Sequence, residues 1–317
     1  MKIGIDAMGG DYAPLECVKG ALRAGAELGR SAQLVLFGDE PLLSSIIMNE
    51  GGAADNISIV HTQEVIGMAE SPTRGLTQKP NSSIAVGFQY LKEGKVDAFA
   101  SAGNTGAMLV GAMYSVKTIE GVIRPAISTL LPHSDERLGF LLDVGANADC
   151  KPEMLLQFGI MGSLYAKHLY KVKDPKVALL SIGEEEGKGN LLVQAAYPLF
   201  QECNKIHFIG NVEGRDIFGD IADVIVTDGF TGNIVLKFGE SIYDMIKKQG
   251  IRDAYWDRFN YENYGGSAIL GANAPVVVAH GISNATAFHN MILLTKEMIE
   301  SRIVELFKEA FINHQAE

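Results

Sequence analysis

Ser101-Ala102-Gly103-Asn104-Thr105-Gly106-Ala107 follows a short apolar run at residues 96–100 and precedes a run of small residues. This order predicts a strand that ends in a glycine-rich turn, and a helix that begins there. The first amides of a helix lack intrahelical partners and the helix dipole favours negative charge, so such a turn can bind a phosphate. The alternative is a helix cap in which the glycines serve close packing.

A second stretch, Asp228-Gly229-Phe230-Thr231-Gly232-Asn233, repeats this construction. It follows an apolar run at residues 224–226 and precedes a helix predicted over residues 232–248. Because two turns of this kind can face one anionic group, the recurrence favours the phosphate-binding interpretation over the cap. We expect both turns to contribute to one site.

Strand-like and helix-like segments alternate through the rest of the chain. Strands are predicted at residues 1–6, 33–37, 57–61, 96–100, 126–131, 138–143, 176–182, 206–209, 224–226 and 276–279. Helices are predicted from residue 14 onward, near residue 216, and at residues 41–49, 82–91, 152–169, 191–201, 232–248 and 284–310. The alternation predicts an α/β fold with helices on both faces of a largely parallel, mixed sheet, whose antiparallel part is a hairpin of residues 126–143. Polar turns after the strands then share the edge where ligands bind.

Several local expectations complete this fold. Asp11 is expected to cap the helix that Pro14 begins. The polar stretch 67–81 contains Pro72 and Pro80, which predict that no helix passes through it, and we interpret it as a lid. No linker or internal repeat interrupts residues 1–317, so we predict a single α/β catalytic domain with a protruding helical element at residues 234–264.

Composition excludes several classes of protein. The 317 residues are 47% apolar and 21% charged, as in a globular protein with a large core. The formal net charge of −11 opposes nucleic-acid binding, which needs a broad basic surface. Because Asp6 lies in the first predicted strand, we expect no ordinary signal peptide here. Three cysteines without metal or redox spacing predict reduced thiols in the cytoplasm.

Most familiar catalytic motifs are missing from the sequence. Residues 183–190 resemble a P-loop, but the glycine spacing is one residue short and Gly189 replaces the required hydroxyl residue. Lys188 is still a cation in a glycine-rich loop after a strand, suited either to an oxyanion or to simple solvation. We find no GxGxxG motif, no nucleophile signature and no histidine pair at metal-ligand spacing. Asp216, Asp220 and Asp223 are a weak alternative metal cluster, since the first two share a face of a predicted helix at i, i+4.

Five motifs, read together, carry a resemblance to a known family. They are residues 8–14 (Met-Gly-Gly-Asp-Tyr-Ala-Pro), 101–107, 142–147, 228–233 and 263–267 (Asn-Tyr-Gly-Gly-Ser). In this order and over nearly the whole length, the chain resembles the bacterial acyl-ACP:phosphate acyltransferases, the PlsX family. The resemblance implies an isocitrate/isopropylmalate-dehydrogenase-like three-layer α/β/α fold. It also implies a cytoplasmic homodimer, peripheral at the membrane, that moves a fatty acyl group from acyl carrier protein to inorganic phosphate for phospholipid synthesis.

This chemistry needs neither a cofactor nor a metal. Orthophosphate is already a nucleophile and a thiolate is a tolerable leaving group, so the protein has to bind the anion, orient it and stabilise the tetrahedral oxyanion. Anion and oxyanion contacts are assigned to Asn104, Thr105, Thr231, Asn233 and Lys188. Asp6, Asp143 and Asp228 are predicted at strand ends, where one of them accepts a proton and the others orient the site; which one is the base stays open.

Further phosphate-binding residues are predicted from the neighbouring turns. They are Gly103, Gly106, Lys79, Asn81, Ser82, Ser83, Asn147, Asn190, Gly232 and His280. Lys79 to Ser83 bring a second cation and a helix N-terminus from the predicted lid. His280 ends the last strand, where a core histidine is the alternative.

Partners and competing functions follow from the same features. The acidic carrier protein is expected to meet Lys247, Lys248, Arg252 and Arg258. Residues 249–264 are short for a membrane-binding insertion, so we expect the preceding helix to serve mainly the dimer and Trp256 to touch membranes weakly. The competing hypotheses are a metal- and NAD-dependent decarboxylating dehydrogenase and a non-catalytic acyl-carrier or membrane scaffold.

Overall fold

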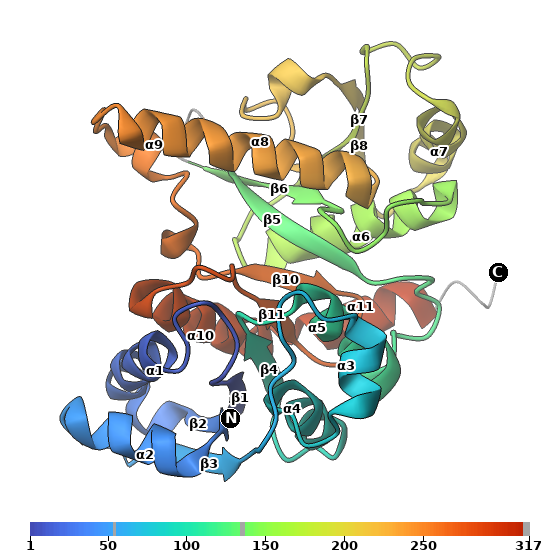
Figure 1. Ribbon diagram of the computed structural model, residues 1–317. Helices are drawn as coiled ribbons and strands as arrows, with labels where there is room; N and C mark the ends of the chain where they lie inside the picture. The colour runs from blue at the N-terminus through green and yellow to red at the C-terminus, as the bar shows by residue number, and fades with distance from the viewer. Residues whose placement is uncertain (53–54, 134–136, 313–317) are drawn as a thin grey trace. The chain divides into compact units, whose positions relative to one another are not determined.

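The computed structural model describes residues 1–52, 55–133 and 137–312, and the chain separates into two compact units (Figure 1). Unit 1 consists of Met1–Thr118 and Tyr261–Val304, and unit 2 of Ile119–Asn260 and Glu305–Glu317. Each unit has strands and covering helices of its own. The single catalytic domain over residues 1–317 stays a prediction.

Unit 1 is built on a largely parallel sheet in the order β3-β2-β1-β4-β11-β10. Its strands are β1 (Lys2–Asp6), β2 (Gln33–Gly38), β3 (Ile57–His61), β4 (Ala98–Ser101), β10 (Ser267–Leu270) and β11 (Val276–Val278). Every neighbouring pair is parallel except β10 with β11. The carboxyl ends of β1, β4 and β11 therefore meet at one edge.

Helices cover both faces of the unit 1 sheet. They are α1 (Leu15–Leu28), α2 (Glu40–Asn49), α3 (Pro72–Gln78), α4 (Ser83–Lys92), α5 (Thr105–Gly111) and α10 (Ala285–Glu300). In α4, Gly87 lies directly against the ring of Phe99, and Gly20 of α1 lies against Phe288 of α10. Figure 1 shows α4 on one side of β4, and α1 with α10 on the other. Close helix approach at these glycines helps to bury both faces of β1 and β4.

Unit 2 repeats this plan with the strand order β5-β6-β9-β7-β8. Its strands are β5 (Ala126–Pro132), β6 (Leu138–Leu142), β7 (Lys176–Leu180), β8 (His207–Val212) and β9 (Val224–Val226). The predicted antiparallel hairpin is β5 with β6, and the other pairs are parallel. Residues 134–136 of the hairpin turn lie outside the described residues.

The unit 2 helices are α6 (Pro152–His168), α7 (Leu191–Glu202), α8 (Gly229–Lys248), α9 (Ala254–Asp257) and, continuing from unit 1, α11 (Ile303–Ile312). Gly162 of α6 packs against Val224 and Leu142, while Figure 1 shows α8 on the opposite side of β5 and β6. The prediction of an α/β fold, with helices on both faces of a largely parallel mixed sheet, is confirmed.

Three predictions about helices are wrong. A seven-residue helix, α3, forms inside the stretch 67–81 because Pro72 occupies its first turn, where a missing N–H costs nothing. The closing helix breaks into α10 and α11 at Arg302, whose φ of 53° ends a right-handed helix. The helix near residue 216 is only the 3₁₀ turn Gly214–Asp216. The strand β10 was not predicted.

Two predicted helix starts also need correction. Asp11 does not cap α1: Pro14 stands at the cap position without a side-chain bond, and the Asp11 amide donates to the Gly281 carbonyl instead. The helix α8 begins three residues earlier than expected because Asp228 is its N-cap, accepting from the Thr231 amide at 2.8 Å. The stretch from Gly229 to Asn233 is thus the first turn and a half of α8.

None of the helices among the described residues is long and apolar enough to span a bilayer. The uncharged stretch 98–116 forms β4, α5 and the single π-helical turn Ala112–Val116.

The contact of α8 with the loop after β6 predicts that an alanine substitution at Gly232 destabilises the protein far more than one at Gly187. A Cβ on Gly232 would collide with the Asp143 carbonyl oxygen, whereas a Cβ on Gly187 meets nothing within 4 Å. We expect Gly232→Ala to lower the free energy of unfolding by about 2–3 kcal/mol and Gly187→Ala to change it by less than about 0.5 kcal/mol. Urea unfolding of both variants measures the difference, and equal midpoints would contradict the described contact.

Candidate active site

The carboxyl edge of the unit 1 sheet brings together several predicted residues. Asp6 ends β1 and Ser101 ends β4, and His280 follows β11 by two residues. Since these three strands are parallel neighbours, their ends share the edge at which α/β proteins bind ligands. The expected placement of the polar turns is confirmed within this unit.

Asp6 organises the turn after β4. The Ser101 hydroxyl donates to Asp6 Oδ2 at 2.6 Å, and the Gly103 amide donates to Ser101 Oγ at 2.8 Å. The Met8 amide donates to Asp6 Oδ1 at 3.0 Å, and a Cβ on Gly9 would collide with the Asp6 carboxylate. Asp6 and Ser101 are both buried. The pairing of Ser101 with Asp6 could not be predicted from the sequence, because it depends on the parallel pairing of β1 with β4.

Burial raises the pKa of Asp6, while hydrogen bonds from Ser101 and the backbone oppose the rise without cancelling it. Ser83 is buried at the first position of α4, beyond its N-cap Ser82, whose hydroxyl accepts from the Ala85 amide at 3.3 Å. Two of the predicted phosphate-binding residues thus lie at one helix start, and Ser83 is close to Asp6. A carboxyl group with a raised pKa is suited to exchanging a proton with a ligand.

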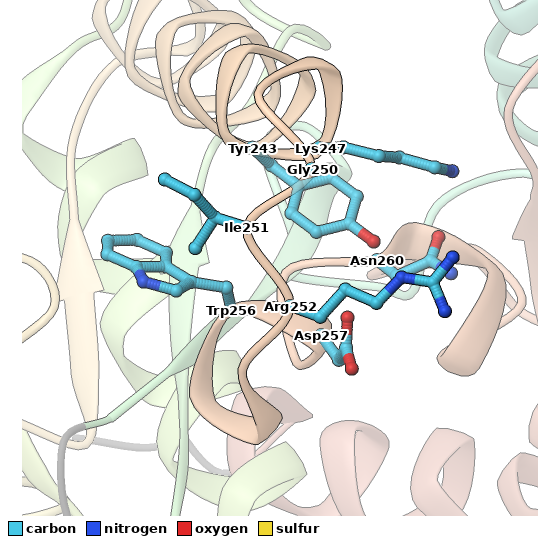
Figure 2. Close-up of a pocket in the computed structure, with 8 residues that line it drawn as sticks. All are labelled: Tyr243, Lys247, Gly250, Ile251, Arg252, Trp256, Asp257 and Asn260. Atoms are coloured by element: carbon cyan, nitrogen blue, oxygen red, sulfur yellow. The ribbon is translucent and has the colours of Figure 1, made fainter.

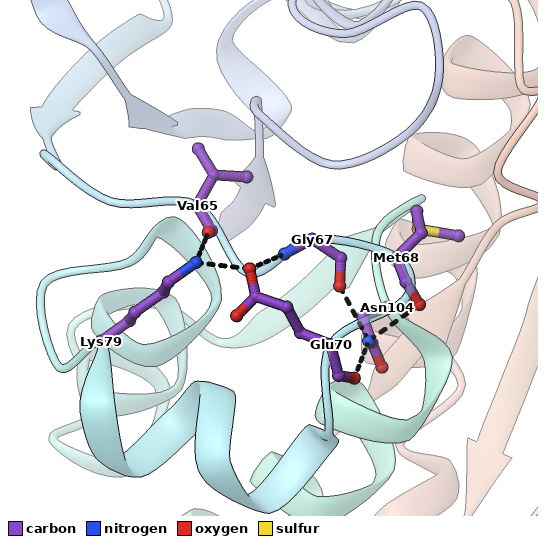
Figure 3. A network of polar contacts seen from close by, with 6 residues as sticks. All are labelled: Val65, Gly67, Met68, Glu70, Lys79 and Asn104. Atoms are coloured by element: carbon purple, nitrogen blue, oxygen red, sulfur yellow. Dashed lines mark hydrogen bonds and ion pairs between the residues drawn. The ribbon is translucent and has the colours of Figure 1, made fainter.

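Asn104 is the N-cap of α5 and also holds the segment 67–70 (Figure 3). Its Oδ1 accepts from the Ala107 amide at 2.9 Å. Its Nδ2 donates to the carbonyls of Gly67, Met68 and Glu70 at 3.0, 3.2 and 3.0 Å. Both the oxygen and the nitrogen of this buried amide therefore have protein partners, and Asn104 acts as a brace that holds residues 67–70 against the start of α5. Its direct contact with an anion stays a prediction.

The residues around Asn104 share this braced region. A Cβ on Gly106 would collide with Pro72, so the stretch 67–72 lies directly over the start of α5, beside the exposed Thr105. Lys79 pairs with Glu70 and donates to the Val65 carbonyl at 2.7 Å (Figure 3). The Lys79 ammonium lowers the pKa of Glu70. Lys79 therefore has a carboxylate partner, which an incoming anion has to replace.

Two more predicted residues of unit 1 have local roles. The Asn81 amide donates to Glu64 Oε2 at 3.1 Å. The half-buried His280 ring packs against Tyr261, with 5.1 Å between the ring centroids.

Asp143 is the centre of the unit 2 edge. Its Oδ1 accepts from the Ile127 and Ala146 amides at 3.0 and 3.1 Å. Its Oδ2 accepts from the Asn147 amide and side chain at 2.7 and 2.9 Å. Burial raises the pKa of Asp143 despite these bonds. Four donors on one buried carboxylate fix the loop that follows β6.

The start of α8 packs onto this loop. The Gly229 amide donates to the Asn147 carbonyl at 2.7 Å, and a Cβ on Gly229 would lie 2.7 Å from Asp143 Oδ2. Asn233 lies over Gly145, with its Oδ1 3.6 Å from an ideal Cβ there. The Thr231 hydroxyl donates to Asp228 Oδ2 at 2.8 Å. Asp143, Asn147, Asp228, Thr231, Gly232 and Asn233 thus form one connected group.

The loop that carries Lys188 lies after β7. Lys188 is exposed, and its stem lies 2.9 Å from an ideal Cβ on Gly183, so the loop closes on itself. Asn190 is the N-cap of α7, accepting from the Val193 amide at 2.9 Å. The structure gives no contact from Lys188 to the Asp143 group. The shared anion site of the two turns, one in each unit, stays a prediction.

The alternative metal cluster and a thiol nucleophile have little support. Asp223 accepts from Arg137 at 2.7 Å and from the Lys176 amide at 2.9 Å, and Asp216 accepts from the Glu213 amide. Over residues 1–52, 55–133 and 137–312, no group of His, Cys, Asp or Glu side chains is arranged to hold a metal ion. Burial raises the pKa of Cys150 to about 12, so this thiol stays protonated near neutral pH.

Comparison with known proteins identifies the family of this chain. The model of a family described as "Fatty acid synthesis protein" matches residues 1–255. The chain belongs to this family. It is 44% identical to the phosphate acyltransferase of Desulforamulus reducens over 99% of this chain and 98% of that protein. It is 42% identical to the phosphate acyltransferase of Dictyoglomus turgidum, over 96% and 95% of the two chains.

Solved structures show the same fold at low sequence identity. The phosphotransacetylase of Streptococcus pyogenes has a TM-score of 0.64 and 18% identity, covering 95% of this chain and 94% of that one. The branched-chain phosphotransacylase of Enterococcus faecalis V583 has a TM-score of 0.60 and 16% identity, covering 94% and 98% of the two chains.

The raised pKa of Asp6 predicts a pH dependence of stability. A carboxyl group that binds its proton more tightly when folded stabilises the protein below its unfolded pKa near 3.8, and this contribution is lost as pH rises through the folded pKa. In the wild type, the unfolding free energy is expected to fall as pH rises, by up to about 1.4 kcal/mol per pH unit on account of Asp6. We expect Asp6→Asn to remove this contribution to the slope. Urea midpoints measured from pH 4 upward test it, and a slope identical to that of the wild type would contradict it.

Proposed function

We propose that this protein transfers an acyl group from a thioester to inorganic phosphate and releases an acyl phosphate. The observation that carries the proposal is membership of the family, together with 40–44% identity to phosphate acyltransferases over nearly the full length of both chains. The polar turns at the carboxyl ends of the strands support the proposal, because they contain amide and hydroxyl groups of the kind that bind such an anion.

The proposed reaction is a direct displacement. A phosphate oxygen attacks the thioester carbonyl, the carbonyl π electrons move to its oxygen, and the tetrahedral intermediate collapses by expelling the thiolate. The phosphate proton passes to a carboxylate and then to the thiolate. Asp6 and Asp143, both buried with raised pKa values, and the N-cap Asp228 are the candidates for this base.

Substrate contacts are divided between direct and indirect roles. Direct phosphate and oxyanion contacts are proposed for Lys188, Asn233 and Thr105. They are also proposed for Lys79, Thr231 and Gly103 after these leave their present partners Glu70, Asp228 and Ser101. Asn104, Asn147 and Asn190 are proposed to act by holding the turns, because their side chains already bind protein groups. Ser82 and Ser83 contribute the start of α4.

We propose acyl carrier protein as the acyl donor, and the end of α8 with the segment that carries α9 as the surface that it contacts. The end of α8 and the segment with α9 enclose a pocket of about 340 Å³ (Figure 2). Figure 2 shows the head groups of Lys247 and Arg252 on one side of this pocket and the indole of Trp256 on the other. Arg258 was expected in this cationic group, but it donates to the carbonyls of His133 and Arg137 at 2.7 and 2.6 Å. Lys247, Lys248 and Arg252 remain as the proposed contacts of the acidic carrier.

The homodimer is proposed to form along α8. Only Gly229 and Gly232 of its 20 residues are buried. Phe230, Ile234, Phe238 and Met245 are exposed at helical spacing, which gives the helix an uncovered apolar face. A second copy of the chain is the proposed cover, with cytoplasmic location and weak membrane contact through the Trp256 segment. No nucleic-acid partner is proposed for a chain of net charge −11.

The proposed reaction predicts products that can be counted. Incubation of the protein with an acyl-carrier thioester and phosphate, in the presence of EDTA, is expected to release one free thiol for each acyl phosphate formed. Thiol titration and hydroxylamine trapping measure the two products. Product formation only with a divalent cation and NAD present would favour the dehydrogenase hypothesis, and carrier binding without turnover would favour the scaffold.

Lys188 tests the proposed oxyanion contact. One charged contact to a developing oxyanion is worth about 100-fold in turnover, whereas an exposed loop lysine contributes little to stability. We expect Lys188→Ala to lower kcat by about 100-fold with an unchanged Tm. Lys173→Ala, an exposed lysine before β7, is the matched control and should keep wild-type turnover. Equal activity of the two variants would remove Lys188 from the mechanism.

A further inference from the structure

Three loops of unit 1 meet at the carboxyl edge of its sheet, and each exposes a large apolar side chain. Tyr12 is 55% exposed, Met68 49% and Ile282 43%. Tyr12 lies after β1, Met68 lies in the stretch that Asn104 holds, and Ile282 lies after β11. Apolar side chains scattered singly over a surface are ordinary. A group of them at the edge of a sheet where ligands bind indicates contact with an apolar ligand or partner.

Close contacts near Gly281 bring the three loops together. The Asp11 amide, next to Tyr12, donates to the carbonyl of Gly281, next to Ile282, at 2.7 Å. The terminal methyl of Met68 lies over Gly281, 3.0 Å from an ideal Cβ there. Figure 3 shows the Met68 side chain directed away from the hydrogen bond that its carbonyl makes to Asn104. The three side chains therefore project from one small area.

This area adjoins the turn that Asp6 organises. An ideal Cβ on Gly10 lies 3.2 Å from the Gly281 carbonyl and 3.3 Å from the Cβ of Ala102, which stands between Ser101 and Gly103. The polar turn and the apolar group are thus neighbours on one edge. An acyl thioester has the same two parts, a polar reacting carbonyl and an apolar chain.

We propose that Tyr12, Met68 and Ile282 form the contact surface for the acyl chain of the substrate. This proposal rests on the proposed function, which brings an acyl group to the site. A fatty acyl chain is flexible and apolar, so it follows an irregular surface, and the unbranched thioether of Met68 adapts to it. Each methylene that leaves water on such a surface raises affinity by up to about fourfold.

The test compares a long and a short acyl group on the same carrier. Hexadecanoyl and butanoyl thioesters of acyl carrier protein are assayed with phosphate by thiol release, for the wild type, Met68→Gln and Ile282→Gln. We expect each variant to lower kcat/KM for the hexadecanoyl donor by about tenfold and for the butanoyl donor by less than about twofold. Met48→Gln is the control, because Met48 is 76% exposed on α2 and lies outside this group.

The outcomes distinguish failure of the acyl-chain surface from failure of the proposed acyltransferase function. An equal loss on both donors would assign these residues to the carrier protein and overturn the proposal, as would wild-type kinetics with both donors. A change in oligomeric state, measured by analytical ultracentrifugation, would assign them to an interface between copies and also overturn it. If the wild type turns over neither donor, the proposed function fails. An unchanged Tm shows that the variants are folded.

Discussion

Two buried aspartates, Asp6 and Asp143, determine how the carboxyl edge of each unit's sheet is built, and neither has a cationic partner among the described residues. A carboxylate that leaves water loses several kcal/mol of hydration, and only hydrogen bonds or protonation can compensate for the loss. Asp143 has four N–H donors, and Asp6 has the Ser101 hydroxyl together with backbone amides. Each bond ties the carboxyl group to the turn beyond its strand, so the conformation of the turn and the burial of the charge depend on each other.

Glycines permit the approach that these carboxylates require. Gly9 stands against Asp6, and Gly229 and Gly232 stand against Asp143 and its loop. A methyl group at any of these positions would separate the turn from the carboxylate. The polar turns of each unit are therefore packed directly against the buried carboxylates, with no room for a side chain at these glycines.

The sequence predicted the order of strands and helices because apolar runs alternate with amphipathic ones over most of the chain. It also placed Asp6 at the end of β1 and Asp143 next to the end of β6, whereas Asp228 lies two residues beyond β9. It could not show that Asp228 caps α8, since a glycine-rich stretch reads equally well as a turn or as the first turn of a helix. The sequence also could not predict the partners of Asn104, Lys79 and Arg258. Each of these side chains contacts a segment that the fold, rather than the local sequence, brings close to it. The family resemblance supplied the reaction, which spacing alone left open.

The brace at Asn104 has a mechanical consequence. One amide group offers two hydrogens to three carbonyls, so the bonds to Gly67, Met68 and Glu70 share their donors. No other side chain combines this reach with a neutral double donor and an acceptor for the Ala107 amide: an aspartate would face three carbonyl dipoles, and a glutamine is one carbon too long. Residues 67–70 are consequently tied to the start of α5 by one amide group, while the Glu70–Lys79 pair ties them to the end of α3, so rotation of the Asn104 side chain would remove three of these contacts at once.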